Sequence, residues 1–153
     1  MPANVLALVY PPEQIFITGY LFDDPSLGIT VTCRVPTETF YTARPIPYVT
    51  AENYVRCLSQ ASYLLAEHVL EARLLSLEMD VEVFRSAAAN YEIYYRNLAM
   101  TFHHRTERSQ PFEMRLALEN WREIRRMGDF LLFTFANKRT VISGEMSFVF
   151  PGH

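Results

Sequence analysis

The sequence predicts one α+β domain over residues 1–153, in which a curled antiparallel sheet packs around a single long helix. Residues 51–69 have the helical period, with apolar side chains on one side and polar ones on the other. Strand-like segments precede this helix and fill most of the chain after residue 91. A chain of 153 residues is long enough for one domain with a real core.

Two strands are predicted before the long helix. Residues 15–22 read as a strand, and residues 29–35 alternate apolar with polar side chains, the period of a half-buried strand. A Pro-rich segment then leads into the helix, whose expected N-cap is Thr50. Asp80 is the expected N-cap of a second, shorter helix that runs through about Asn90.

Four strands that could form a meander are predicted after the second helix. They cover residues 92–105, 112–125, 129–136 and 140–150, with a short hairpin turn at 137–139. A helix over 112–127 is the alternative, because Glu, Arg, Met and Leu favour helix. The strands on both sides favour the strand interpretation.

Large side chains are frequent, since the chain contains 11 Phe and 9 Tyr and half of its residues are hydrophobic. An apolar ligand tunnel, a subunit interface or a well-filled core would each use this surplus. The net charge of −3 argues against a nucleic-acid partner.

The two cysteines, Cys33 and Cys57, form neither a CxxC pair nor a metal-ligand pattern. We therefore expect buried thiols, no metal and no redox cofactor. No apolar run approaches about 18 residues, and the N-terminus lacks a basic region followed by an apolar run. These observations predict a soluble cytoplasmic protein that is neither secreted nor inserted into a membrane.

The polar side of the 51–69 helix is the main candidate for a functional surface. Glu52 is its one carboxylate and a candidate general base, but an i,i+4 ion pair with Arg56 is an equal alternative. The N–H groups of the first turn could stabilise a developing oxyanion, or Thr50 could simply cap them. An ordinary solvated face is the alternative for the whole surface. The polar side consists of Glu52, Arg56, Ser59, Gln60 and Tyr63.

Several short segments have an order and spacing that a known family shares. They are Tyr41…Arg44, Thr50-Ala51, Cys57 to Tyr63, Asp80…Phe84, His103-His104-Arg105 and Ser143 to Met146. In these segments the chain resembles the FcoT-like thioesterases, which have a hotdog fold, a curled antiparallel sheet wrapped around a long central helix.

The resemblance implies a site at three positions of the family pattern. The family has a tyrosine before the helix, an asparagine at its start and another asparagine about two and a half turns further on. These positions fall on Tyr41, Thr50 and Ser59, so hydroxyl residues replace both asparagines. A further family tyrosine near the N-terminus falls nearest to Tyr10.

The resemblance also implies acyl-thioester processing that ends in hydrolysis, with Tyr41, Thr50 and Ser59 as catalytic residues. Glu52, the carboxylate on the polar side of the helix, is the fourth expected catalytic residue. The expected substrate is a thioester of acyl carrier protein or coenzyme A. Some relatives first add glycine to the β-carbon of an α,β-unsaturated acyl-carrier-protein thioester, which gives an N-carboxymethyl β-amino acid after hydrolysis. We favour this version for the chain.

Glycine addition needs a cation for the glycine carboxylate, a base for its ammonium and a site for the enolate oxygen. Arg56 or Arg44 would supply the cation and Glu52 the base, whereas Tyr41 and the helix N-terminus would hold the enolate. The remaining expected substrate-binding residues are Gln60 and Tyr63.

Two alternatives remain open at this stage. One is a plain fatty acyl-CoA or acyl-carrier-protein thioesterase, and the other is a noncatalytic acyl-binding subunit. In each case we expect a homodimer or higher homo-oligomer that forms through an open sheet edge. No serine nucleophile is predicted, because no histidine is placed beside a serine by the sequence.

Overall fold

The computed structural model describes residues 4–23, 25, 27–36, 42–77, 79–124, 130–138 and 141–152. The helical elements are α1 (Val5–Val9), the 3-10 turn η1 (Pro12–Gln14), α2 (Ala51–Glu71) and α3 (Val81–Ala89). The strands are β1 (Ile17–Asp23), β2 (Gly28–Cys33), β3 (Tyr94–Phe102), β4 (Phe112–Ile124), β5 (Phe130–Lys138) and β6 (Ile142–Pro151).

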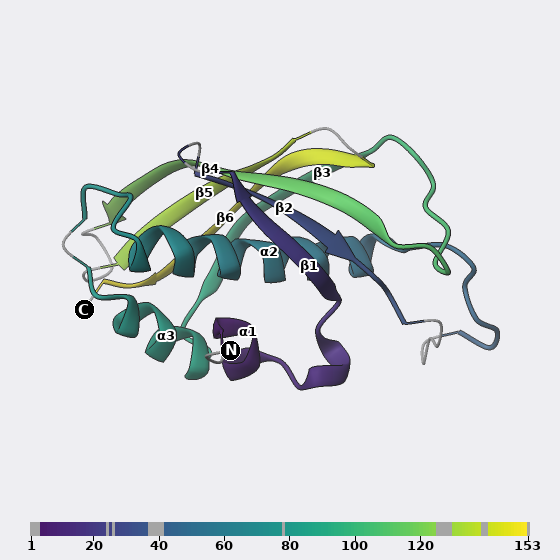
Figure 1. Ribbon diagram of the computed structural model, residues 1–153, viewed down its shortest axis with the longest axis horizontal. Coiled ribbons are helices and arrows are strands. Elements are labelled where there is room, and N and C mark those ends of the chain that lie inside the picture. The colour runs from purple at the N-terminus through teal and green to yellow at the C-terminus, as the bar shows by residue number, and fades with distance from the viewer. Residues whose placement is uncertain are drawn as a thin grey trace.

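The strands form one antiparallel sheet with the order β1-β2-β4-β5-β6-β3. The predicted meander is therefore correct for β4, β5 and β6 but wrong for β3, which lies at the far edge beside β6, with Leu98 opposite Met146. The helices α2 and α3 lie between β2 and β3 in the sequence. Through them the chain passes from β2 to the opposite edge of the sheet, where β3 begins (Figure 1). Long-range pairing of this kind leaves no local sequence signal.

The long helix α2 lies beneath the sheet, and α1 and α3 lie on the side of α2 away from the sheet (Figure 1). Every residue from 57 to 67 is buried, so the middle of α2 is enclosed on its apolar and polar sides alike. The helix is thus a central element and not a surface helix with one solvated face. Within the described ranges, no helix is long and apolar enough to cross a membrane.

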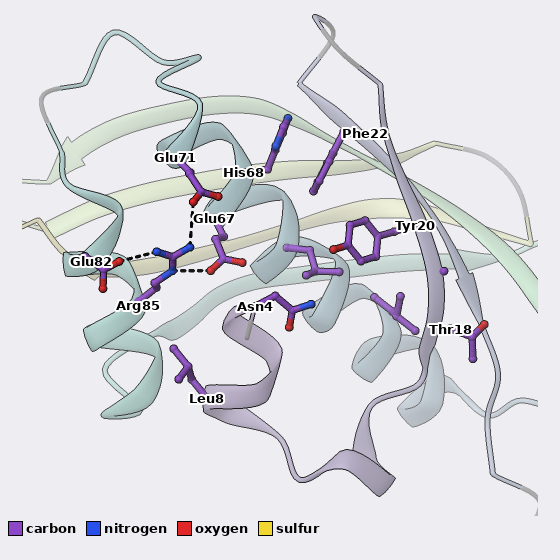
Figure 2. Close-up of a pocket in the computed structure, with 13 residues that line it drawn as sticks. Asn4, Leu8, Thr18, Tyr20, Phe22, Glu67, His68, Glu71, Glu82 and Arg85 are labelled. Carbon is purple, nitrogen blue, oxygen red and sulfur yellow. Dashed lines mark hydrogen bonds and ion pairs between the residues drawn. The ribbon is translucent and has the colours of Figure 1, made fainter. Parts of the chain in front are cut away.

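A partly buried ion pair ties the second helical layer to α2. Arg85 of α3 donates from Nε to Glu67 Oε1 of α2 at 2.7 Å (Figure 2). The other oxygen of Glu67, Oε2, accepts a hydrogen bond from the backbone N–H of Val5 in α1 at 3.1 Å. A buried carboxylate needs such partners, and this one joins three helices.

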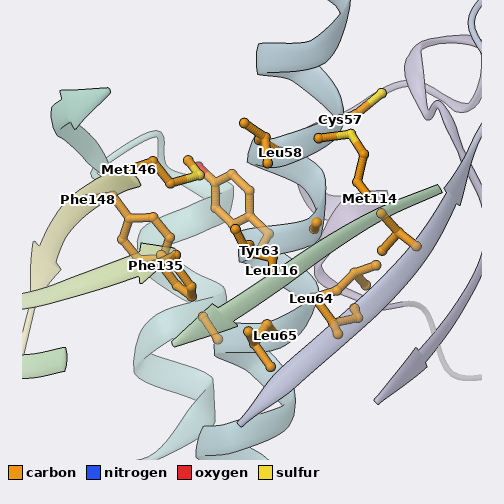
Figure 3. Packing of buried hydrophobic residues seen from close by; sticks show 14 of the residues in the cluster. Cys57, Leu58, Tyr63, Leu64, Leu65, Met114, Leu116, Phe135, Met146 and Phe148 are labelled. Carbon is orange, nitrogen blue, oxygen red and sulfur yellow. The ribbon is translucent and has the colours of Figure 1, made fainter. Parts of the chain in front are cut away.

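The core between α2 and the sheet is rich in aromatic rings. Leu and Met side chains fill the space between α2 and the strands (Figure 3). Cys33 and Cys57 are free and buried, as predicted. Phe rings of α3, β5 and β6 pack in one cluster, in which neighbouring centroids lie 5.1–6.4 Å apart; it consists of Phe84, Phe133, Phe135, Phe148 and Phe150.

Most predicted elements are confirmed. The segment 112–124 is a strand, which confirms the favoured interpretation over the helical alternative. β5 continues through Lys138, which pairs with Arg115, so the turn predicted at 137–139 is wrong for Asn137 and Lys138. The short elements α1 and η1 were not predicted, because five and three residues carry too little periodicity.

Candidate functional site

The N-terminus of α2 is held by a capping box, which confirms Thr50 as the N-cap. Thr50 Oγ1 accepts a hydrogen bond from the Asn53 backbone N–H (3.4 Å), and Asn53 Oδ1 accepts one from the Thr50 N–H (3.1 Å). Asn53 Oδ1 also accepts from Nη2 of the buried Arg108 (2.7 Å). The Asn53 N–H is thus engaged by the cap. In the first turn, the N–H groups that the capping box does not bind are those of Ala51 and Glu52.

The N-terminal segment, defined as residues 4–16, covers the polar side of α2. The side chain of Gln60 is fully buried; its Oε1 accepts from the Phe16 N–H (2.8 Å) and its Nε2 donates to the Gln14 carbonyl (2.7 Å). Arg56 donates to the Gln14 side chain, and its guanidinium lies 5.2 Å from the centre of the Phe16 ring. Gln60 and Arg56, both predicted to bind substrate, hold this segment in place.

The other predicted charged residues lie at the surface. Glu52 Oε1 is 3.9 Å from Arg56 Nη2, and the Glu52 side chain is 58% exposed. The predicted i,i+4 pair is therefore present, although it is long and solvated. Arg44 is exposed in the loop before α2, where its carbonyl accepts a hydrogen bond from Thr42 Oγ1 at 2.6 Å. Tyr41 lies outside the described residues.

A group of four hydroxyl side chains meets in the middle of α2, and we call it the hydroxyl cluster: Tyr10, Ser59, Tyr63 and Tyr95. Ser59 Oγ lies 3.1 Å from the Tyr10 hydroxyl and is hydrogen-bonded to the Tyr95 hydroxyl as well. The Tyr63 ring packs edge-on against Tyr10, with centroids 6.3 Å apart. The cluster thus joins the N-terminal segment, α2 and the edge strand β3.

Sequence reasoning found only part of this cluster. Ser59 and Tyr63 were predicted, and Tyr10 was the position nearest to a family tyrosine. Tyr95 was missed, because its role depends on β3 lying at the sheet edge beside β6. The run Tyr94-Tyr95 was visible in the sequence, but no local pattern says which of its hydroxyls meets α2.

Burial raises the pKa of each tyrosine in the hydroxyl cluster. Removal from water is the largest cause for Tyr10, Tyr63 and Tyr95, and the neighbouring phenols add to it for Tyr63. The Tyr95 ring is 45% exposed, but its hydroxyl points inward to Ser59, which is 6% exposed. These phenols are therefore neutral hydrogen-bond donors near pH 7, and none of them is a base.

Tyr63 carries a hydroxyl that is not satisfied by any of the described residues. The residue is 7% exposed, and its hydroxyl has no hydrogen-bond partner in the part of the chain that the structure describes. In Figure 3 the hydroxyl end of its ring points toward Met146. A buried donor without a partner destabilises a fold by about 1–3 kcal/mol, so such a group is often explained by a bound water or ligand.

A separate serine–histidine pair lies at the other end of β3. His103 Nε2 and Ser143 Oγ are 2.6 Å apart. Ser143 pairs with Thr101, six positions along β3 from Tyr95, or roughly 20 Å at the usual strand rise. This pair was not predicted, and it does not belong to the hydroxyl cluster.

The raised pKa values predict an effect of alkaline pH on stability. Below pH about 10 these phenols are protonated in both the folded and the unfolded chain. Above that pH the phenols of the unfolded chain lose their protons at a lower pH than those of the folded chain. The free energy of unfolding therefore falls as the pH rises. Tyr63→Phe removes one such phenol. We expect this variant to equal or exceed the wild type in stability at pH about 8 and to lose less between pH about 8 and about 11.

Urea unfolding at the two pH values measures this difference. Tyr91→Phe is the matched control, because Tyr91 is 73% exposed and should behave as the wild type does. An equal loss of stability in the wild type and in Tyr63→Phe would show that the Tyr63 hydroxyl is not held in a dry environment.

Comparison with known proteins does not assign the chain to a family. No protein-family model matches it, and a search of curated proteins finds no match either. The features of the chain that bear on its function are the segments it shares with the FcoT-like pattern and the contacts of the hydroxyl cluster.

Proposed function

We propose that the protein processes acyl thioesters in a reaction that ends in hydrolysis, and that the hydroxyl cluster holds the thioester carbonyl. The observation that carries this proposal is the meeting of two phenol hydroxyls, those of Tyr10 and Tyr95, at the buried Ser59. The carbonyl oxygen gains negative charge when water attacks, and donors aimed at it in a dry site stabilise that charge. Water oxygen bonds to the carbonyl carbon, the carbon–sulfur bond breaks, and the proton of the water goes to the departing thiolate.

The fold supports this proposal. A long buried helix beneath an antiparallel sheet is the arrangement expected of a hotdog enzyme, and Ser59 lies in the middle of that helix. The rings of Phe84 and Phe148 lie 6.1 and 6.0 Å from the Tyr63 ring. They give the neighbourhood of the hydroxyls an apolar character that suits an acyl chain.

Addition of glycine before hydrolysis remains the fuller version of the proposal. One observation favours it: the ion pair of Arg56 with Glu52 is long, at 3.9 Å, and solvated. A glycine zwitterion could bridge this pair with its carboxylate on Arg56 and its ammonium on Glu52. Glu52 would take one ammonium proton, and the freed nitrogen would bond to the β-carbon while the α,β double bond becomes an enolate. Glu52 would then return its proton to the α-carbon before hydrolysis.

A noncatalytic acyl-binding subunit is the second candidate. It is favoured by the lack of a base among the four residues of the hydroxyl cluster, because a set of donors can hold a carbonyl without activating water.

Mass spectrometry of products distinguishes these functions. Saturated and α,β-unsaturated thioesters of coenzyme A and of acyl carrier protein are incubated with and without glycine. We expect free acid from the wild type, and with glycine an acid heavier by one glycine from the unsaturated substrate. Ser59→Ala and Tyr95→Phe should each lower kcat/KM on the order of a hundredfold, as loss of one oxyanion donor does.

Tyr91→Phe is the matched control. It should keep full activity, because Tyr91 is 73% exposed and lies before the start of β3. Release of the unmodified unsaturated acid alone would reject glycine addition but keep hydrolysis. Binding of the thioesters without any turnover would reject the enzyme and favour the acyl-binding subunit.

The edge strand β3 is the proposed site of homodimer formation. Its outer edge has no neighbouring strand in the described sheet, and nearly all of its residues are exposed. The exposed apolar residues include Tyr94, Leu98 and Phe102, at 56%, 41% and 48%. Antiparallel pairing of two β3 edges would cover them and would shield Tyr95 from water.

Leu98→Lys tests this assembly, because it places like charges from two copies near one another. We expect light scattering to give twice the mass of the chain for the wild type and the mass of one chain for Leu98→Lys. Leu21→Lys, at the opposite edge of the sheet and 69% exposed, is the control that should remain dimeric. A monomeric wild type, or dissociation by Leu21→Lys instead, would contradict pairing through β3.

A further inference from the structure

A cavity apart from the hydroxyl cluster lies between β1 and the three helices. Its volume is about 790 Å³, and none of the four residues of the hydroxyl cluster lines it. Figure 2 shows an ionic group at one end, built on α2 and α3, and aromatic side chains of β1 at the other. A cavity of this size is large enough for a small organic molecule.

The ionic end of the cavity carries an excess of negative charge. Arg85 contacts Glu67, Glu82 and Glu71 at 2.7, 2.5 and 3.4 Å, so three carboxylates face one guanidinium. Glu67 is buried and receives a further hydrogen bond from the Val5 N–H, whereas the side chains of Glu71 and Glu82 are 62% and 68% exposed. Because the guanidinium is already surrounded by carboxylates, the site disfavours an anion and favours a second cation.

The other end of the cavity is aromatic and has open space. The rings of Tyr20 and Phe22 lie 5.4 Å apart, and the Phe22 ring stacks on His68 with centroids 3.7 Å apart. Gly19, between Ile17 and Tyr20 on the same strand, also lines the cavity, and a Cβ atom built there would meet no atom within 4 Å. Aromatic faces beside carboxylates are a common environment for organic ammonium groups.

We propose that this cavity binds a small organic amine, with its ammonium among Glu67, Glu71 and Glu82 and its apolar body against Tyr20 and Phe22. An excess of carboxylates beside an aromatic wall favours this class of ligand. A metal ion would make no use of the aromatic wall, and the negative charge of a fatty acid would be repelled by the carboxylates.

Three probes of similar shape test the charge preference. 2-Phenylethylamine is a cation, 2-phenylethanol is neutral and 3-phenylpropionate is an anion at neutral pH. We expect isothermal titration calorimetry at low ionic strength to show that the amine binds on the order of tenfold more tightly than the alcohol, and that the carboxylate does not bind. Equal affinity for the amine and the alcohol, or no binding of the amine, would overturn the proposal.

Two variants locate the binding site. Glu71→Gln combined with Glu82→Gln removes the two exposed carboxylates and should weaken amine binding on the order of tenfold. Tyr20→Ala removes one ring of the aromatic wall and should also weaken amine binding on the order of tenfold. Leu21→Ala, on the same strand but outside the cavity lining, is the control that should bind as the wild type does. Unchanged amine affinity in both cavity variants would place the amine elsewhere and overturn the proposal.

Discussion

The hydrogen bonds of the buried Gln60 carboxamide are the interaction on which the rest of the structure depends. They join the middle of α2 to the backbone of Gln14 and Phe16, at the point where β1 begins. A carboxamide inside a core must find partners for both its donor and its acceptor, and each group left without one costs about 1–3 kcal/mol. Gln60 therefore sets where the N-terminal segment lies. Once that segment is in place, Tyr10 reaches Ser59 and the Val5 N–H reaches Glu67.

The same contacts divide the polar side of α2 into structural and chemical parts. Gln60 and Arg56 are engaged with the N-terminal segment, and Glu52 extends into solvent. Ser59 alone among them faces other hydroxyl groups, which come from the N-terminal segment and from β3. The polar side chains that looked like one surface in the sequence are thus mainly the docking surface of residues 4–16. A small cluster of neutral donors is what the geometry offers to a carbonyl oxygen.

Local signals made much of the fold predictable. The period of α2, the caps at Thr50 and Asp80 and the alternation of β2 all depend on neighbouring residues, and all are confirmed. Features that depend on distant partners could not be predicted. The place of β3 beside β6, and hence the role of Tyr95, follows from pairing across the sheet. The burial of Gln60 follows from contact with residues 44 and 46 positions away.

The site was predictable in part for the same reason. Ser59 and Tyr63 could be identified because helical spacing places them on one face, whereas the functions of Glu52 and Arg56 could not be separated from an ordinary ion pair. Only the fold shows that the hydroxyls of Tyr10 and Tyr95 meet at Ser59, one from the N-terminal segment and one from β3. The sequence alone does not show whether a polar residue of this helix holds another segment of the chain or takes part in a reaction.

Native-state hydrogen exchange of the Phe16 amide tests the central role of Gln60 most directly. The account predicts that this amide is protected in the wild type and loses protection in Gln60→Leu, while the amides of β4 stay protected in both proteins. Gln110→Leu, at an exposed position, should leave the Phe16 amide unchanged. Equal exchange of the Phe16 amide in the wild type and in Gln60→Leu would show that the carboxamide does not hold the N-terminal segment, and would contradict the account.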